Sequence, residues 1–216
     1  VPGDGPADSR EWERFLSLLA ACRTREPLNG FVAVVGADRL LAGDPDGTAD
    51  YARALRRRIN ETMRVVGARF PVYVLVTKAD LVLGFSEFSE LLPDEELRQP
   101  LGFLAEEGPL APEDEVARGM ERLGARFKDL RLAGTLVKGQ AAPPALLFPG
   151  ELSALTPALS RFCATLFEEN PYLETPMFRG LFFASARRGD APRPALYPER
   201  SEERRVGEEC SSRWSP

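Results

Sequence analysis

Two short apolar runs on either side of a helical segment constrain the fold of this 216-residue chain more than any other feature. The runs, Phe31–Gly36 and Val72–Val76, contain no polar break, which indicates strands buried on both faces and therefore a parallel sheet. After a polar turn at residues 43–47, we expect Thr48 to cap a helix that ends at Gly67. The apolar residues of that helix recur at helical spacing: Tyr51, Leu55, Ile59, Met63 and Val66. Strand, helix and strand in this order predict a right-handed parallel crossover.

The rest of the pattern predicts an α/β chain interrupted by a long helical segment. A first helix begins at Asp8 or Ser9 and ends before Pro27, and a last strand spans Phe178–Ala184. Between them, two amphipathic helices are expected to pack face to face, separated by a loop through residues 138–144. Their apolar positions are Val116, Met120, Leu123, Phe127 and Leu130, and then Leu152, Leu155, Leu159, Phe162 and Leu166. We therefore expect an α/β half-domain at residues 8–84 and 176–190, a mostly helical insertion at 85–175, and a disordered tail at 191–216.

The composition excludes several classes of function. The sequence has no histidine, which removes Ser-His-Asp and Cys-His catalysis and every histidine-ligated metal. Cys22, Cys163 and Cys210 are too scattered for a zinc site or a disulfide framework, so we expect a reducing compartment. With 28 Lys+Arg against 33 Asp+Glu and no long basic block, no nucleic-acid partner is expected. No apolar stretch approaches the ~18 residues of a membrane span, so we expect none in this fragment.

The clearest functional motif follows the second strand. Thr77-Lys78-Ala79-Asp80 matches [NT]-K-x-D, the motif with which GTPases read guanine, and it lies where an open parallel sheet binds ligands. The carboxylate of Asp80 could accept both the N1 hydrogen and the amino group of guanine, which adenine does not offer. Lys78 would lay its stem over the purine with its ammonium near the ribose, and Thr77 would tether neighbouring backbone. The alternative interpretation is a polar turn in which Asp80 only caps the next helix.

A second motif, Ser185-Ala186, follows the last strand, where GTPases place a backbone amide against the guanine carbonyl. The sequence contains no G-x-x-x-x-G-K-[ST] phosphate loop and no D-x-x-G switch before the first helix, so we expect neither catalytic nor metal-binding residues. GTP is the expected nucleotide, and Mg²⁺ would bind only together with a phosphate loop encoded upstream. The fold class expected from these motifs is the C-terminal half of a P-loop GTPase-like parallel sheet, with one edge uncovered.

Longer stretches of the chain resemble the cytoplasmic domain of the TssM/IcmF family of bacterial type VI secretion systems. They are EWERFLSLL with REPLNGFVAVV, then RFPVYVLVTKADLVLGFSEF, and FPGELSALTPALSRFCATLFEENPYLETPMFRGLFFASARRG. The resemblance implies a P-loop NTPase-like domain at the cytoplasmic face of the inner membrane, anchored by helices outside this fragment. It also implies TssL-like and TssJ-like subunits and baseplate components as partners. The Ser185-Ala186-Arg187-Arg188 sequence departs from the more usual Ser-Gly-Thr-Gln of the family.

The sequence leaves two functions open. The first is a nucleotide-binding-like scaffold whose insertion contacts other secretion components, and which is not catalytic as an isolated fragment. The second is a GTP-binding and hydrolysing domain whose phosphate loop lies upstream. Residues 200–216 resemble the translation of a common DNA-sequencing adapter, which predicts an artefactual end, and a natural disordered charged tail is the alternative.

Overall fold

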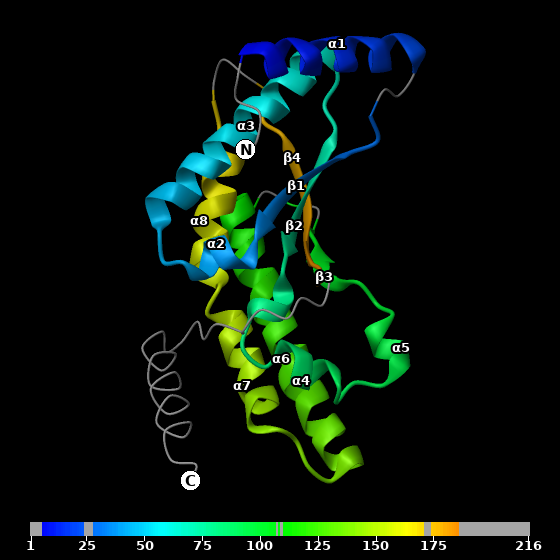
Figure 1. The fold of residues 1–216 in the computed structure, drawn as a ribbon, viewed down its shortest axis with the longest axis vertical. Helices are drawn as coiled ribbons and strands as arrows, with labels where there is room; N and C mark the ends of the chain where they lie inside the picture. Colours follow the sequence, from blue (N-terminus) through cyan, green and yellow to red (C-terminus); the bar gives the residue numbers. More distant parts are fainter. Residues whose placement is uncertain (1–5, 24–27, 107, 109, 171–173, 186–216) are drawn as a thin grey trace, which may run out of the picture.

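The computed structural model describes residues 6–23, 28–106, 108, 110–170 and 174–185. Figure 1 shows a sheet with helices α3 and α8 beside it, helix α1 across one end, and α4, α6 and α7 extending beyond the other end. The expected tail at 191–216, including 200–216, lies outside the described residues. The elements are α1 (Pro6–Cys22), β1 (Phe31–Gly36), α2 (Ala37–Leu41), α3 (Pro45–Val66), β2 (Pro71–Thr77), the 3-10 turn η1 (Ala79–Leu81), α4 (Phe85–Ser89), α5 (Asp94–Leu97), β3 (Leu101–Leu104), α6 (Pro112–Lys138), α7 (Pro143–Ser153), α8 (Thr156–Leu166) and β4 (Met177–Phe183).

The sheet has four strands in the order β1-β2-β4-β3. Strand β2 pairs in parallel with β1 on one side and with β4 on the other, as the α/β interpretation expected. The expectation of an all-parallel sheet is wrong, because β3 pairs antiparallel with β4. Its four residues were too few to predict, and Gly102 sits at φ 155°, where a Cβ would overlap the carbonyl of Leu181. Pairing with β4, rather than local propensity, makes this segment a strand.

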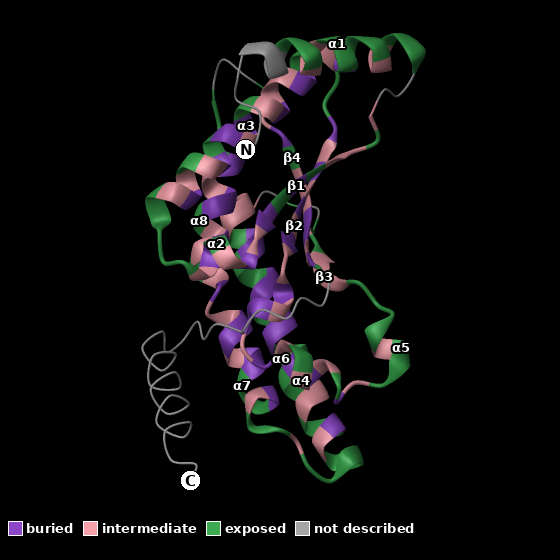
Figure 2. Ribbon diagram, viewed as in Figure 1, coloured by how far each residue is buried: buried purple, intermediate pink, exposed green. Residues whose placement is uncertain are grey.

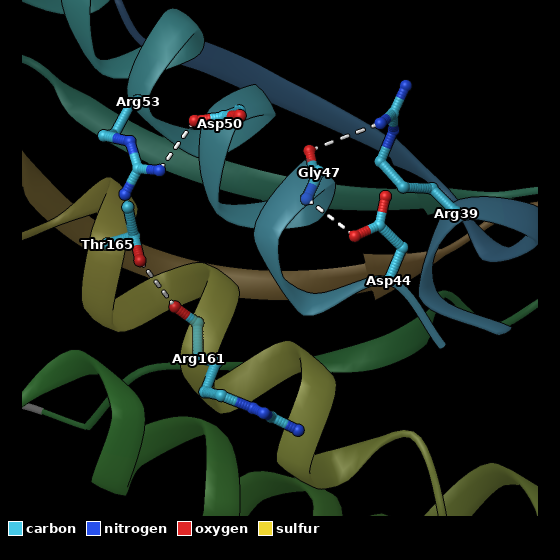
Figure 3. Close-up of polar contacts among 7 residues, drawn as sticks. All are labelled: Arg39, Asp44, Gly47, Asp50, Arg53, Arg161 and Thr165. Atoms are coloured by element: carbon cyan, nitrogen blue, oxygen red, sulfur yellow. Dashed lines mark hydrogen bonds and ion pairs between the residues drawn. The ribbon is translucent and has the colours of Figure 1, made fainter. Parts of the chain in front are cut away.

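The crossover from β1 to β2 runs through α3 as expected, but the helix begins earlier than predicted. Asp44, not Thr48, is the N-cap, and its Oδ1 accepts a hydrogen bond of 2.9 Å from the Gly47 amide. Figure 3 shows this cap, with Nη1 of Arg39 3.4 Å from the Gly47 carbonyl oxygen. Residues 45–47, expected as a turn, therefore form the first turn of α3. The helix ends at Gly67 with φ 68°, as predicted.

The main core lies on one side of the sheet. Alternate residues of β1, β2 and β4 are buried there against α3, α6 and α8, as Figure 2 shows. On the opposite side, which we call the open face, Val32 and Val34 are 52% and 39% exposed. The expectation that β1 is buried on both faces is therefore wrong, because its alternate side chains point to a face on which they remain accessible.

The segment between β2 and β4 is helical apart from β3. Helices α6 and α8 contact each other, as expected, and the predicted single helix through Leu152 and Leu166 is divided into α7 and α8 around Ala154. Pro143, expected in a loop, occupies the first turn of α7, where its missing amide costs nothing. We call α4, α6 and α7 the helical arm. None of the helices in the described part of the chain is long and apolar enough to cross a bilayer.

Four phenylalanines hold the helical arm together. Phe88 of α4 lies 5.2 Å, between ring centroids, from Phe127 of α6 and 4.9 Å from Phe148 of α7. Phe85 adds an edge-on contact with Phe148 at 5.6 Å. Before α4, Gly84 adopts φ 83°, and a Cβ there would overlap the carbonyl oxygen of Pro144 at the start of α7. The arm therefore packs directly on the chain that leaves β2 and η1.

Candidate functional site

The carboxyl ends of three parallel strands meet at one end of the sheet. Lys78 and Asp80 follow β2, and Ser185 follows β4, two residues beyond its end at Phe183. Two backbone hydrogen bonds tie these turns together, since the Ala79 amide donates to the Ala184 carbonyl at 3.1 Å and the Ala184 amide donates to the Val76 carbonyl at 2.8 Å. We call this group of residues, with Asp38 of α2, the strand-end site.

The structure brings Asp80 and Ser185 into direct contact. The hydroxyl of Ser185 donates a hydrogen bond of 2.6 Å to Oδ1 of Asp80, although 105 residues separate the two in sequence. Asp80 lies within η1, and the next helix, α4, is capped by Gly84 without a side-chain hydrogen bond. Asp80 therefore does not cap α4, which corrects the capping part of the alternative interpretation. Its carboxylate is instead aimed across the strand ends toward β4.

Lys78 lies beside this pair with an unusual backbone conformation. Its φ is 59°, and it is the one non-glycine residue with a positive φ in the described part of the chain. A side chain in this left-handed region costs roughly 1–2 kcal/mol. Nζ of Lys78 lies 2.6 Å from Oδ2 of Asp38, which belongs to α2 directly after β1. Backbone strain retained at a polar strand end is typical of functional sites.

The sequence pattern does not single out Asp38. Its pKa is lowered from 3.8, chiefly by the hydrogen bond from Lys78, with smaller contributions from the charge of Lys78 and from backbone amides, while desolvation opposes the shift. The available signal was weak: an acidic residue two positions after a predicted parallel strand, at the edge where ligands of such sheets bind. The short helix α2 that carries it was not predicted either.

The structure says less about the two remaining predicted site residues, Thr77 and Ala186. Thr77 is the half-buried last residue of β2, in register with Gly36 at the end of β1. Ala186 lies outside the described residues.

Cys163 offers no nucleophile, because burial above all, and then the charge of Glu113, raises the pKa of its thiol. Among the residues that the structure describes, no cluster of three or more His, Cys, Asp or Glu side chains is arranged to hold a metal ion.

The strand-end site can accept further hydrogen bonds. The carboxylate of Asp80 has acceptor capacity beyond its bond from Ser185, because two oxygens provide about four lone-pair positions. The aliphatic stem of Lys78 runs toward α2, with its ammonium held at the carboxylate of Asp38. The sequence offers no phosphate loop that could bind a triphosphate.

A second region stands out at the far end of the helical arm. Five large apolar side chains are exposed there, and Arg131 of α6 connects the two helices that carry them by donating to the carbonyl of Leu146 at 2.7 Å. A cavity lined by Glu87, Glu90 and Lys138 among others lies nearby, between α4 and the connection from α6 to α7. We call the exposed apolar set the arm tip: Leu132 at 59%, Leu136 at 84%, Val137 at 85%, Leu146 at 42% and Leu147 at 49%.

Comparison with known proteins decides the family. The family model of the IcmF-related N-terminal domain matches residues 6–215. The chain therefore belongs to the TssM/IcmF family. Over 199 residues it is 39% identical to the type VI secretion system component TssM1 of Pseudomonas aeruginosa strain PAO1, a match that covers 86% of this chain and 17% of that protein. No solved structure matches.

Proposed function

We propose that this TssM/IcmF domain is a nucleotide-binding-like scaffold of a type VI secretion membrane complex, and that the arm tip contacts other secretion components. The observation that carries the proposal is the exposure of Leu136 and Val137, at 84% and 85%, in the last two turns of α6. Scattered exposed apolar residues are ordinary, but a group on two adjoining helices is typical of an interaction surface. The relative's identity as a type VI secretion component supports this role.

Family membership supports the proposed setting. The domain works at the cytoplasmic face of the bacterial inner membrane, with membrane anchoring outside this chain. Its partners are TssL-like and TssJ-like subunits of the membrane complex and components of the baseplate. A cytoplasmic arm can contact the baseplate and the cytoplasmic part of a TssL-like subunit directly.

The test is a binding comparison with a matched control. The double variant Leu136→Asp/Val137→Asp places charges on the arm tip, and Leu18→Asp/Leu97→Asp does the same at exposed apolar positions of α1 and α5, which are 59% and 50% exposed. We expect the first variant to lose recovery of TssL-like or baseplate proteins from the same secretion system, and the second to retain it. Circular dichroism melts check that both fold. Equal recovery by the two variants contradicts the proposal.

A second function, GTP binding, is favoured by the hydrogen bond of 2.6 Å between Ser185 and Asp80. It brings together the two strand-end motifs that GTPases use for guanine. Hydrolysis needs a phosphate loop, which this sequence lacks, so a GTPase would require that loop upstream of Val1. Reading the parent gene upstream distinguishes an enzyme from a scaffold.

Substitution of Asp80 tests directly whether its carboxylate selects the guanine base. Asp80→Asn exchanges an acceptor for a donor, so we expect preference to move from guanine toward xanthine nucleotides, which present a carbonyl where guanine has an amino group. Asp94→Asn, on α5, serves as control. Competition between GTP, ATP and xanthosine triphosphate, followed by NMR shifts of the Ala79 amide, measures the preference. An unchanged preference in Asp80→Asn rejects Asp80 as the base reader.

A further inference from the structure

The ion pair between Lys78 and Asp38 joins the ends of β1 and β2. The ammonium of Lys78 lies 2.6 Å from Oδ2 of Asp38, and the two side chains are 40% and 38% exposed. The hydrogen bond from Lys78 is also the largest cause of the lowered pKa of the Asp38 carboxyl. The stem of Lys78 is therefore held at both ends, by its backbone directly after β2 and by the carboxylate of Asp38 in α2.

Stability does not account for this arrangement. A partly exposed ion pair contributes little to folding, since water and side-chain entropy offset most of the attraction. The left-handed backbone of Lys78 is unfavourable for a residue with a side chain. Asp50 and Arg53 form an ion pair of the same length, 2.6 Å, within α3 and without a positive φ, so the strain at Lys78 is not needed for pairing as such.

The directions of the Lys78 and Asp80 side chains indicate how the ion pair could affect a bound base. Lys78 turns toward β1 while Asp80, two residues later, turns toward Ser185 at the end of β4. The two side chains therefore point toward the strands on either side of β2. A flat base that presents its edge to Asp80 can then stack on that stem, provided that the stem does not rotate.

We propose that Asp38 is a positioning residue for guanine binding, which holds the stem of Lys78 as the surface on which the purine stacks. This inference rests on the second function proposed above. Asp38 acts through Lys78 and does not itself select the base, so its removal weakens binding without changing the preference among purines.

The test uses the whole chain and guanosine, whose binding does not depend on a phosphate loop. NMR titrations that follow the amides of Ala79 and Ser185 give the dissociation constant. We expect Asp38→Asn to weaken binding about threefold, as suits a partly exposed ion pair. Asp38→Glu keeps the carboxylate and regains most of the affinity. Asp50→Asn, which breaks the ion pair of α3, leaves the affinity unchanged.

A double-substitution comparison separates positioning from a structural role. In Lys78→Met the stem has lost its charge, so adding Asp38→Asn produces no further change, whereas a structural role of Asp38 weakens binding in both backgrounds. Amine labelling gives a readout without nucleotide. Asp38→Asn increases the labelling rate of Lys78 relative to that of the exposed Lys128 on α6.

The outcomes distinguish the two proposals. If the unaltered chain shows no guanosine-dependent shift, the nucleotide function fails and the positioning role fails with it. If the unaltered chain binds guanosine and Asp38→Asn binds it equally well, only the positioning role is overturned. Loss of affinity that persists in the Lys78→Met background also overturns it.

Discussion

At the strand-end site, polar side chains from three parts of the chain hold one another at 2.6 Å, whereas at the arm tip apolar side chains of α6 and α7 face solvent. The first region is defined by geometry, because its contacts depend on the register of β1, β2 and β4. The second region is defined by the apolar character of its side chains, which are exposed to solvent and do not depend on a precise set of contacts. We therefore expect substitutions at the strand ends to change specificity and those at the arm tip to change association.

The largest expected effect distinguishes the interior of the arm from its tip. Phe148 is 1% exposed and contacts three other phenylalanine rings, so Phe148→Ala should destabilise the domain by about 3–5 kcal/mol. Its neighbour Leu147 is 49% exposed, and Leu147→Ala should change stability by about 0.5 kcal/mol or less. Urea unfolding of both variants measures the difference. Similar values would mean that the arm tip is part of the core.

A smaller effect is expected from the backbone of the strand-end site. Lys78→Gly and Lys78→Ala both remove the ion pair with Asp38, but only alanine keeps a Cβ at φ 59°. We expect the glycine variant to be the more stable of the two by about 1 kcal/mol. Chemical denaturation curves of the two variants give this difference directly. A more stable alanine variant would show that the left-handed conformation is not maintained.

The smallest effect is a pH dependence that the strand-end site should show and the apolar arm tip should not. The pKa of Asp38 is lowered in the folded chain, so its stabilising contribution is present above its ordinary value of 3.8 and is lost as the pH falls through the lower, folded value. The contribution should be below about 1 kcal/mol, because the pair is partly exposed. We expect Asp38→Asn to be less stable than the unaltered chain at neutral pH and equal to it at strongly acidic pH. A difference in melting temperature that stays constant with pH would exclude this linkage.

Much of the strand-end site could be predicted because strand-end positions follow from topology. A parallel β1-α3-β2 unit fixes where Lys78 and Asp80 lie, and a later parallel strand brings Ser185 to the same edge. Asp38 could not be predicted with equal force, because an isolated acidic residue in a short helix has no periodic or motif context. Its role depends on the direction of another side chain, which sequence spacing does not specify.

The errors in the fold have similar physical causes. Strand β3 depends on a partner that lies more than 70 residues later, and Gly102 lowers its local propensity. Threonine often caps helices, which favours Thr48 as the cap of α3, but Asp44 precedes a proline at the first helical position and is the cap in the structure. For β1, uninterrupted apolar sequence indicated burial on both sides, but the described residues bury only one. The domain limits at 84 and 176, and the roles of Thr77 and Ala186, remain predictions.

The contact between Gly84 and Pro144 links the two regions mechanically. Gly84 follows Asp80 by four residues, and its missing side chain lets the beginning of α7 rest directly on the backbone. A force applied to the arm by a bound protein would therefore reach the turn that carries Asp80 without passing through a flexible linker. A side chain at position 84 would overlap the carbonyl of Pro144 and so separate the start of α7 from the turn that carries Asp80.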